Sequence, residues 1–217
     1  VLLRQFLVAH QGNMASNNKV AVIDKQFVDQ EYITDIESDV LKGVASVECF
    51  GALTAEEVPD RVSEVDAILS WHHITNIGSE LLDKMKKTQV IVRIGMGYDN
   101  VDCNEAAKRG IKVCNVPDYG IEEVADSTMC FLLNVMRRTY WLAKGTKEGK
   151  WNTKETKGAT RLNGRVLGLI GIGRIGTAVA LRAKAFNLKV IYYDPYIEHG
   201  KMKSLGLDGQ VYSLDEL

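Results

Sequence analysis

The sequence predicts an α/β protein built on parallel strands, in two successive domains. From Lys19 onward, short apolar runs alternate with stretches of helical periodicity, which is typical of parallel strands joined by helices. A second alternation follows a long apolar helix in the middle of the chain, and it begins with a glycine-rich turn directly after a strand. Both observations favour sheets with helices on both faces.

In the first domain the apolar runs predict strands near 20–24, 46–50, 67–70, 89–94 and 112–115. Helices are predicted between them, near 29–41, 55–64, 78–86 and 102–109. The last of these has Lys108 and Arg109 in its final turn and Gly110 just beyond. Cations favour a helix C-terminus and glycine favours the left-handed cap, so we expect the helix to end there.

A long helix is expected to begin near Glu122 and to continue to about Ala143. It is apolar on several sides, so we expect both domains to cover it. The polar segment 144–161 is interpreted as a solvated loop in preference to a basic binding patch. A new strand, parallel and buried, is predicted at 165–170, followed by a helix from Thr177 to about Ala185 and a strand at 188–193.

The expected domain organisation is a disordered or upstream segment over 1–18, a first domain over 19–118 and a second over 119–217. The chain begins with Val and has a plausible start at Met14, so residues 1–13 are interpreted as upstream sequence. The pattern stops within an element at Leu217. We therefore expect the chain to be a fragment.

Composition is that of a globular protein, with 46% hydrophobic and 25% charged residues. The formal net charge of −1 provides no global attraction to nucleic acid or an anionic membrane, and neither is an expected partner. The first ten residues resemble neither a signal peptide nor a membrane span. Four cysteines lack metal-ligand spacing and are interpreted as reduced and structural, which suits the cytoplasm or nucleus. No metal site is predicted.

The glycine-rich turn reads Gly171-Ile172-Gly173-Arg174-Ile175-Gly176 and follows Ile170 directly. This is a G-x-G-x-x-G motif, which is weak alone but specific between a strand and a helix. The following strand ends in Asp194, about 20 residues past the motif, where dinucleotide-binding folds carry an acidic residue. We therefore predict that Ile170 to Gly176, with Asp194, bind a dinucleotide.

Each part of that motif has a physical task. Gly171 allows the tight turn, Gly173 leaves room for the pyrophosphate, and Gly176 lets helix and strand approach closely, while the helix N-terminus donates N–H groups to the phosphates. Asp194 can accept the ribose hydroxyls and would repel a 2′-phosphate, so NAD(H) is favoured over NADP(H). The alternative is that Asp194 is a turn residue before Pro195.

Several motifs in this order resemble the D-isomer-specific 2-hydroxyacid dehydrogenases, and among them the C-terminal-binding-protein branch, which contains NADH-binding transcriptional corepressors and related dehydrogenases. The similarity begins near residue 20. The motifs are the run 90–102, Val113-Cys114-Asn115-Val116-Pro117, Glu122-Glu123-Val124-Ala125-Asp126, the glycine turn, 179–186 and Tyr193-Asp194-Pro195-Tyr196.

The resemblance implies a flavodoxin-like substrate domain, a Rossmann NAD-binding domain of which the chain holds the first half, and a cleft between them. By similarity, the backbone N–H groups of Gly95 and Gly97 face the substrate carboxylate, Met96 contacts the cofactor, and Arg93 lies nearby. Two alternatives remain: Gly95 and Gly97 form a plain turn, and Arg93 forms a structural ion pair.

The family's reaction passes a hydride between substrate C2 and the nicotinamide, while a His paired with a carboxylate moves the hydroxyl proton and an Arg holds the substrate. The resemblance places these three residues beyond Leu217, so no catalytic residue is expected here and the chain by itself is expected to be inactive. His10, His72, His73 and His199 are elsewhere. His72 and His73 are interpreted as loop or packing residues.

The resemblance leaves two functions open. One is an enzyme that acts on a small 2-keto or 2-hydroxy acid and is a homodimer when complete. The other is a corepressor that binds short transcription-factor peptides in an apolar groove aligned with 46–62, which would add a nuclear location to the cytoplasmic one. Glu48 lies in that groove, and an unpaired charge there would be costly. The enzyme is therefore favoured.

Overall fold

The computed structural model describes residues 17–24, 34–72, 74–151 and 153–217. The chain divides into two compact units, residues 1–119 and 120–217. Our expectations for residues 1–13, for His73 and for the beginning of the predicted helix 29–41 lie outside the described residues.

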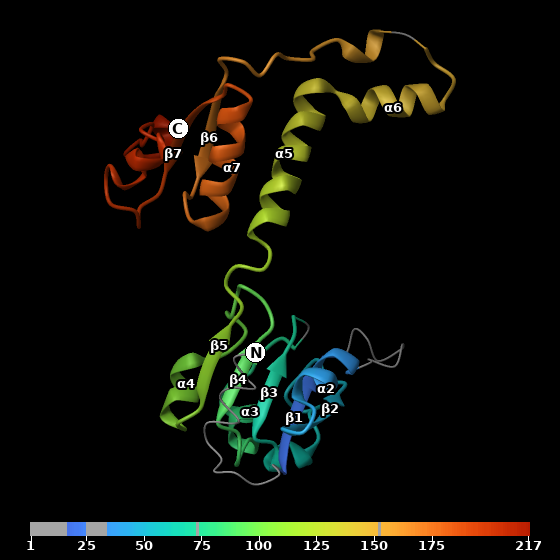
Figure 1. The fold of residues 1–217 in the computed structure, drawn as a ribbon, viewed down its shortest axis with the longest axis vertical. Coiled ribbons are helices and arrows are strands. Elements are labelled where there is room, and N and C mark those ends of the chain that lie inside the picture. Colours follow the sequence, from blue (N-terminus) through green and yellow to red (C-terminus); the bar gives the residue numbers. More distant parts are fainter. Residues whose placement is uncertain (1–16, 25–33, 73, 152) are drawn as a thin grey trace. The chain divides into compact units, whose positions relative to one another are not determined.

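The first unit contains a five-stranded parallel sheet in the order β2-β1-β3-β4-β5 (Figure 1). This is the flavodoxin-like order, in which β2 is added on one side of β1, and β3, β4 and β5 are added on the other side, so the order of addition reverses between β1 and β3. The predicted fold class is confirmed, and each predicted strand is present within two residues at either end. The strands are β1 (Asn18–Ile23), β2 (Ala45–Phe50), β3 (Ala67–Ser70), β4 (Val90–Arg93) and β5 (Lys112–Asn115).

Side chains from successive strand residues fill two cores, one on each face of this sheet. Ile23, Ile68 and Ile91 belong to one apolar cluster, whereas Val22 and Leu69 belong to the other. Because both faces are buried, the strands read as continuous apolar runs rather than alternating ones. The α-helices among the described residues of this unit are α2 (Asp35–Leu41), α3 (Ser79–Lys84) and α4 (Cys103–Lys108).

The predicted helix 55–64 is wrong. Only a 3₁₀ helix over Asp60–Glu64 forms there, and it starts directly after Pro59. Proline has no N–H to donate and disfavours helical backbone at the residue before it, so an α-helix does not pass through this point. The predicted end of 102–109 is confirmed, with Gly110 in the left-handed region at φ +72°.

The second unit begins with α5 (Ile121–Arg137) and α6 (Thr139–Lys147), where one continuous helix was predicted. Arg138 separates them with a left-handed backbone at φ +57°. Its Nε donates to the carbonyl of Glu155 at 2.9 Å, and its guanidinium lies 4.4 Å from the centre of the Trp141 ring. These contacts stabilise a conformation that L-residues otherwise avoid. The predicted loop 144–161 is helical at its start and contains a 3₁₀ turn at Lys154–Thr156.

The rest of this unit is β6 (Val166–Ile170), α7 (Arg174–Ala185) and β7 (Lys189–Tyr193), with β6 and β7 parallel. α7 packs on α5, and Arg182 joins them through ion pairs with Asp126 and Glu122. β6 was predicted to be buried, but Val166 is 59% and Ile170 77% exposed. These side chains share one face of the two-stranded sheet, on which the side chain of Leu217 lies close to Gly168.

Among the described residues, no helix combines the length and apolar character needed to cross a membrane.

Candidate functional site

The glycine turn joins β6 to α7 and is held by its own backbone. Gly171 has φ +88°, a conformation that side chains disfavour, and its N–H donates to the carbonyl of Tyr193 at 2.8 Å. Gly176 lies so close to the turn that a Cβ atom on it would be 2.3 Å from the carbonyl oxygen of Gly171. The first turn of α7 therefore packs directly on the backbone of the loop.

Gly173 differs from these two because a Cβ atom on it would meet nothing within 4 Å. It is the N-cap of α7, and no side chain caps the helix. Within the described part of the chain, the N–H groups of Arg174, Ile175 and Gly176 donate no hydrogen bond. Unpaired N–H groups at the start of a twelve-residue helix attract anions. A hollow beside them is lined by Ile172, Gly173 and Arg174, with Ile197, Lys201 and Met202 from the segment after β7.

Asp194 closes this site from the end of β7. Its Oδ2 accepts the N–H of Ile172 at 2.9 Å, and its Oδ1 accepts the N–H of Tyr196 at 2.9 Å. The second contact is the turn that we had considered as an alternative, so the carboxylate caps a turn and also reaches the glycine loop. A carboxylate oxygen can accept more than one hydrogen bond, so both oxygens can also accept one from a ligand.

These features fit a dinucleotide. The space at Gly173 accommodates a pyrophosphate against the backbone, the first turn of α7 supplies its donors, and Asp194 lies within reach of the loop where the adenosine ribose would be. Ile172 is fully buried beneath the turn, whereas Arg174 is exposed and Ile175 is half-buried. The sequence motif therefore forms the loop that it predicts.

The first unit places its candidate residues where β4 ends. Gly95 N–H donates to the carbonyl of Arg93 at 2.9 Å, and Gly95 in turn accepts from Val116 N–H at 3.0 Å. The carbonyl of Met96 accepts the side-chain amide of Asn115 at 2.8 Å. Within the described residues, the N–H groups of Met96 and Gly97 donate no hydrogen bond. The loop thus keeps two adjacent donors at the carboxyl edge of the sheet.

Arg93 lies directly beneath this loop and is only 7% exposed. A Cβ atom on Gly95 would be 1.7 Å from its Nη1, so glycine is needed there for packing and not for an unusual backbone angle. Nη1 donates to the carbonyl of Ile94 at 3.1 Å, and Nη2 lies 2.8 Å from Nδ1 of His72. In the described part of the chain, Arg93 has no acidic partner and its Nε makes no hydrogen bond. The ion pair that we had considered is not found there.

His72 was interpreted as a loop or packing residue, and no sequence pattern indicated its contact with Arg93. It is exposed and follows β3, the strand that pairs with β4. Ser70 is the register partner of Arg93, so two further residues along the chain bring His72 beside the guanidinium. The adjacency of these strands and their register were the missing information.

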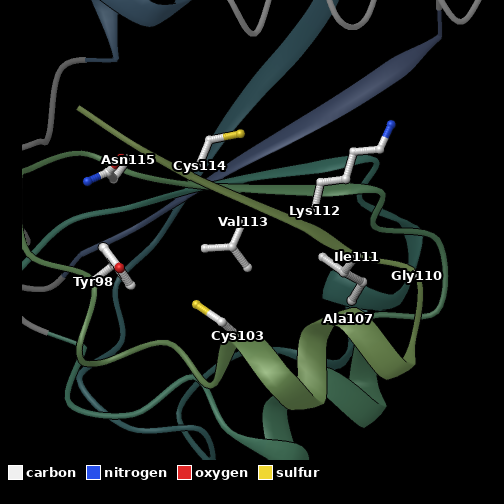
Figure 2. A pocket seen from close by; sticks show the side chains of 9 residues that line it. All are labelled: Tyr98, Cys103, Ala107, Gly110, Ile111, Lys112, Val113, Cys114 and Asn115. Carbon is white, nitrogen blue, oxygen red and sulfur yellow. The ribbon is translucent and has the colours of Figure 1, made fainter. Parts of the chain in front are cut away.

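Another hollow runs along β5 and α4 (Figure 2). Figure 2 shows Val113 and Cys114 on opposite sides of β5, as alternation in a strand requires. All four cysteines are free thiols, and Cys114 and Cys130 are exposed, so the structural role expected for these two is wrong. β5 is an edge strand, and Cys114 lies on the side of it that faces away from α4 (Figure 2). Among the described residues, no group of three or more His, Cys, Asp or Glu side chains could hold a metal ion.

Glu48 lies on β2, the other edge strand of the sheet. Its Oε1 forms an ion pair with Nη2 of Arg61 at 2.5 Å, and the Arg61 guanidinium also lies 4.9 Å from the centre of the Phe50 ring. The charge of Glu48 is therefore paired, and about half of both side chains is exposed to solvent.

Two family models match the chain. Residues 20–165 match the catalytic domain of the D-isomer specific 2-hydroxyacid dehydrogenases, and residues 129–217 match the NAD binding domain of the same family.

Individual relatives agree with these models. The chain is 42% identical to C-terminal-binding protein 1 of Caenorhabditis elegans over 188 residues, which is 83% of this chain and 26% of that protein. It is 38% identical to D-3-phosphoglycerate dehydrogenase of Methanocaldococcus jannaschii over 169 residues, which is 78% of this chain and 32% of that protein. The crystal structure of D-lactate dehydrogenase from Aquifex aeolicus, complexed with NAD and lactic acid, superposes with a TM-score of 0.71 at 26% identity, covering 90% of this chain and 56% of that one.

Proposed function

Because the chain belongs to the D-isomer specific 2-hydroxyacid dehydrogenase family, we propose that the whole protein is an NAD-dependent oxidoreductase that interconverts a 2-hydroxy acid and its 2-keto acid. The chain spans about a third or less of the curated relatives that it matches. The two units supply different parts of the reaction. Residues 129–217 contribute to the NAD binding domain, and the first unit contributes the substrate side.

The observation that carries the proposal is the environment of Arg93. A guanidinium that is 93% buried without a carboxylate partner in the described residues is unfavourable, because the desolvated charge is not compensated. It lies beside the Gly95–Gly97 loop, where the N–H groups of Met96 and Gly97 are available. The carboxylate of a 2-hydroxy acid would supply the missing negative charge and accept these donors.

When bound, NAD supplies the hydride acceptor, and NADH the donor in the reverse direction. The chain's own residues bind and orient. Gly173 and the first turn of α7 would hold the pyrophosphate, and Asp194 would accept the ribose hydroxyls. Arg93 and the N–H groups of Met96 and Gly97 would fix the carboxylate end of the substrate. The N–H of Gly95, which we expected to face the substrate, donates instead to the carbonyl of Arg93, so Gly95 contributes by leaving room for the guanidinium. Met96 would border the cofactor. Proton transfer to the substrate oxygen is assigned to a histidine outside this chain, as the family resemblance implies.

Turnover tests the proposal. The whole protein should oxidise NADH in the presence of a small 2-keto acid such as pyruvate, glyoxylate or hydroxypyruvate, and absorbance at the nicotinamide band measures the rate. Replacing Arg93 by Met should raise KM strongly, since it removes the charge that compensates the carboxylate. Tight NADH binding without turnover on a broad panel of 2-keto acids would contradict the enzyme function.

A second candidate is an NADH-binding corepressor that docks short transcription-factor peptides, and one contact favours it more than the sequence did. The charge of Glu48 was expected to be costly in an apolar groove, but Arg61 pairs with it. Peptide binding to the first unit, measured by fluorescence anisotropy with Glu48→Ala as the comparison, would support this function. Lack of peptide binding together with keto-acid turnover would leave the enzyme alone.

The assembly and location of the whole protein are part of the same proposal. Large apolar side chains of α5 remain exposed, with Phe131 at 70%, which supports a homodimer. Four free thiols, two of them exposed, support a reducing compartment, the cytoplasm or, for a corepressor, the nucleus.

A further inference from the structure

Two adjacent peptide units of the loop after β4 are anchored to the end of β5. The carbonyl of Gly95 accepts the backbone N–H of Val116 at 3.0 Å, and the carbonyl of Met96 accepts the side-chain amide of Asn115 at 2.8 Å. Asn115 is the last residue of β5, and Val116 follows it directly. The loop is therefore held to the end of one strand through two successive carbonyl groups.

An anchored carbonyl fixes the direction of the N–H group in the same peptide unit. A trans peptide unit is planar, so its C=O and N–H bonds point in opposite directions. The carbonyl of Gly95 shares its unit with the N–H of Met96, and the carbonyl of Met96 shares its unit with the N–H of Gly97. Both N–H groups, which donate no hydrogen bond within the described residues, therefore point away from the groups that bind the carbonyls.

This pair of donors has the geometry of an anion site. In an extended strand successive carbonyl groups point to opposite sides. When two successive carbonyls bind the end of the same strand, the chain has to turn between them, and successive N–H groups of a turn form a concave anion-binding arrangement. The loop lies against the guanidinium of Arg93, the register partner of Asn115. Two neutral donors and one cation thus occur together at the carboxyl edge of the sheet.

The two anchors place different demands on the sequence. Any residue except proline can donate the backbone N–H at position 116, and Pro117 favours an extended backbone there. The anchor of the Met96 carbonyl needs a side chain with a donor, which the amide of Asn115 supplies. An ionised aspartate has nearly the same shape but can only accept. The direction of the Gly97 N–H therefore depends on the identity of one side chain.

We propose that Asn115 is a positioning residue, whose amide holds the peptide unit between Met96 and Gly97 in the orientation that presents the Gly97 N–H to the carboxylate of the substrate. The part that concerns the substrate rests on the proposed function. Asn115 acts only through the loop. Its loss should therefore lower the affinity for the 2-keto acid and leave hydride transfer and the cofactor loop of the second unit unchanged.

The anchoring of this peptide unit can be measured by NMR without substrate. Labelling methionine with ¹³C at the carbonyl and glycine with ¹⁵N selects Met-Gly dipeptides, and 96–97 is the only one in these 217 residues. Loss of the signal in Met96→Leu assigns it in the whole protein. Asn115→Leu, which has a similar shape but no donor, should move the carbonyl signal upfield because the hydrogen bond is lost. Cys114→Ala removes the neighbouring exposed side chain of β5 and should leave the signal in place.

Steady-state kinetics of the whole protein test the effect on the substrate. Asn115→Leu should raise KM for the 2-keto acid about 10- to 100-fold, because a hydrogen bond to the charged carboxylate is lost. The kcat and the Kd for NADH should change little. Asn115→His has a ring nitrogen, Nδ1, as many bonds from Cα as the amide nitrogen of asparagine. It should therefore recover part of the affinity and part of the carbonyl shift.

Either measurement can overturn the proposal. The anchoring is refuted if the Met96 carbonyl signal does not move in Asn115→Leu while circular dichroism shows that the variant is folded. If Asn115→Leu does not fold, Asn115→Asp replaces it in the NMR measurement, since it keeps the shape and removes the donor. The role toward the substrate is refuted if the signal moves but KM does not, or if only kcat falls. Absence of turnover in the unaltered protein would refute the proposed function, and the NMR result would still decide the anchoring.

Discussion

Asp194 and Ile172 are joined by a hydrogen bond of 2.9 Å, from the backbone N–H of Ile172 to Oδ2 of the carboxylate. The bond links the end of β7 to the loop that follows β6, and the same carboxylate caps the turn at Tyr196 through Oδ1. The acidic group is thus held in place before any ligand arrives. Its position depends on the glycine loop, and the shape of the loop depends in part on it.

This relationship leads to a prediction about cofactor choice. The whole protein should bind NADH at least about tenfold more tightly than NADPH, a difference of ~1.4 kcal/mol, because the fixed carboxylate would face the 2′-phosphate. Asp194→Asn should narrow the gap, since the amide oxygen keeps one acceptor but the negative charge is gone. Nicotinamide fluorescence titrations with both cofactors measure it. Equal affinities in the unaltered protein would remove the ribose role of Asp194.

Adding a side chain at Gly173 should affect cofactor binding, whereas adding one at Gly176 should affect stability. Gly173→Val should abolish dinucleotide binding and leave the free energy of unfolding within ~1 kcal/mol, because its Cβ position is open and its backbone is extended. Gly176→Ala should destabilise the second unit by about 1–3 kcal/mol, since its Cβ would meet the Gly171 carbonyl at 2.3 Å. Urea unfolding and a cofactor titration on the same samples separate the two effects. Retained binding in Gly173→Val would mean that the motif is only a turn.

Much of the fold was accessible from the sequence because parallel strands buried on both faces are apolar throughout. The run 67–70 is an example, since its predicted and observed bounds are identical. The helix predicted at 55–64 failed despite a signal that was present, Pro59. The break at Arg138 had no such signal. It depends on a carbonyl 17 residues away, that of Glu155, and on the Trp141 ring, and such tertiary contacts are not visible in local periodicity.

The same distinction applies to the sites. Asp194 could be placed from its spacing, because a strand of known length links it to the glycine motif. The contact between Arg93 and His72 could not be predicted from the sequence, because it requires that β3 and β4 be neighbours in a register that pairs Ser70 with Arg93. Strand order in a parallel sheet is a property of the assembled fold.

Gly95→Ala provides a test of the packing beneath the substrate loop. The new Cβ would lie 1.7 Å from Nη1 and 2.9 Å from Cζ of Arg93, so the guanidinium must move. A side-chain end can shift more easily than backbone, so we expect the unit to stay folded with a loss of about 1–3 kcal/mol. KM for the 2-keto acid should rise while NADH affinity is retained, because the cofactor loop lies in the other unit.

Gly110→Ala is a control for stability alone, since its Cβ would contact nothing within 4 Å and only its left-handed backbone would be strained. An unchanged KM in Gly95→Ala would show that Arg93 does not have to be in its observed place.

Ionisation of Glu105 should make the stability of the first unit depend on pH in the acidic range. Hydrogen bonds from Lys108 and Arg109 lower the pKa of its carboxyl from 4.5 to about 2. A pKa that is lower in the folded than in the unfolded chain means that the ionised carboxylate stabilises the fold above pH 4.5, and that this contribution is lost as pH falls toward 2. The Tm of the unaltered chain should therefore be higher than the Tm of Glu105→Gln at pH 7, and this difference should shrink between pH 4.5 and pH 2.

Glu80→Gln is a matched control, because Glu80 also lies in the first turn of a short helix but forms no ion pair within the described residues. The Tm difference between the unaltered chain and Glu80→Gln should stay small at every pH. If the Tm difference between the unaltered chain and Glu105→Gln does not change with pH, then Lys108 and Arg109 do not stabilise the carboxylate.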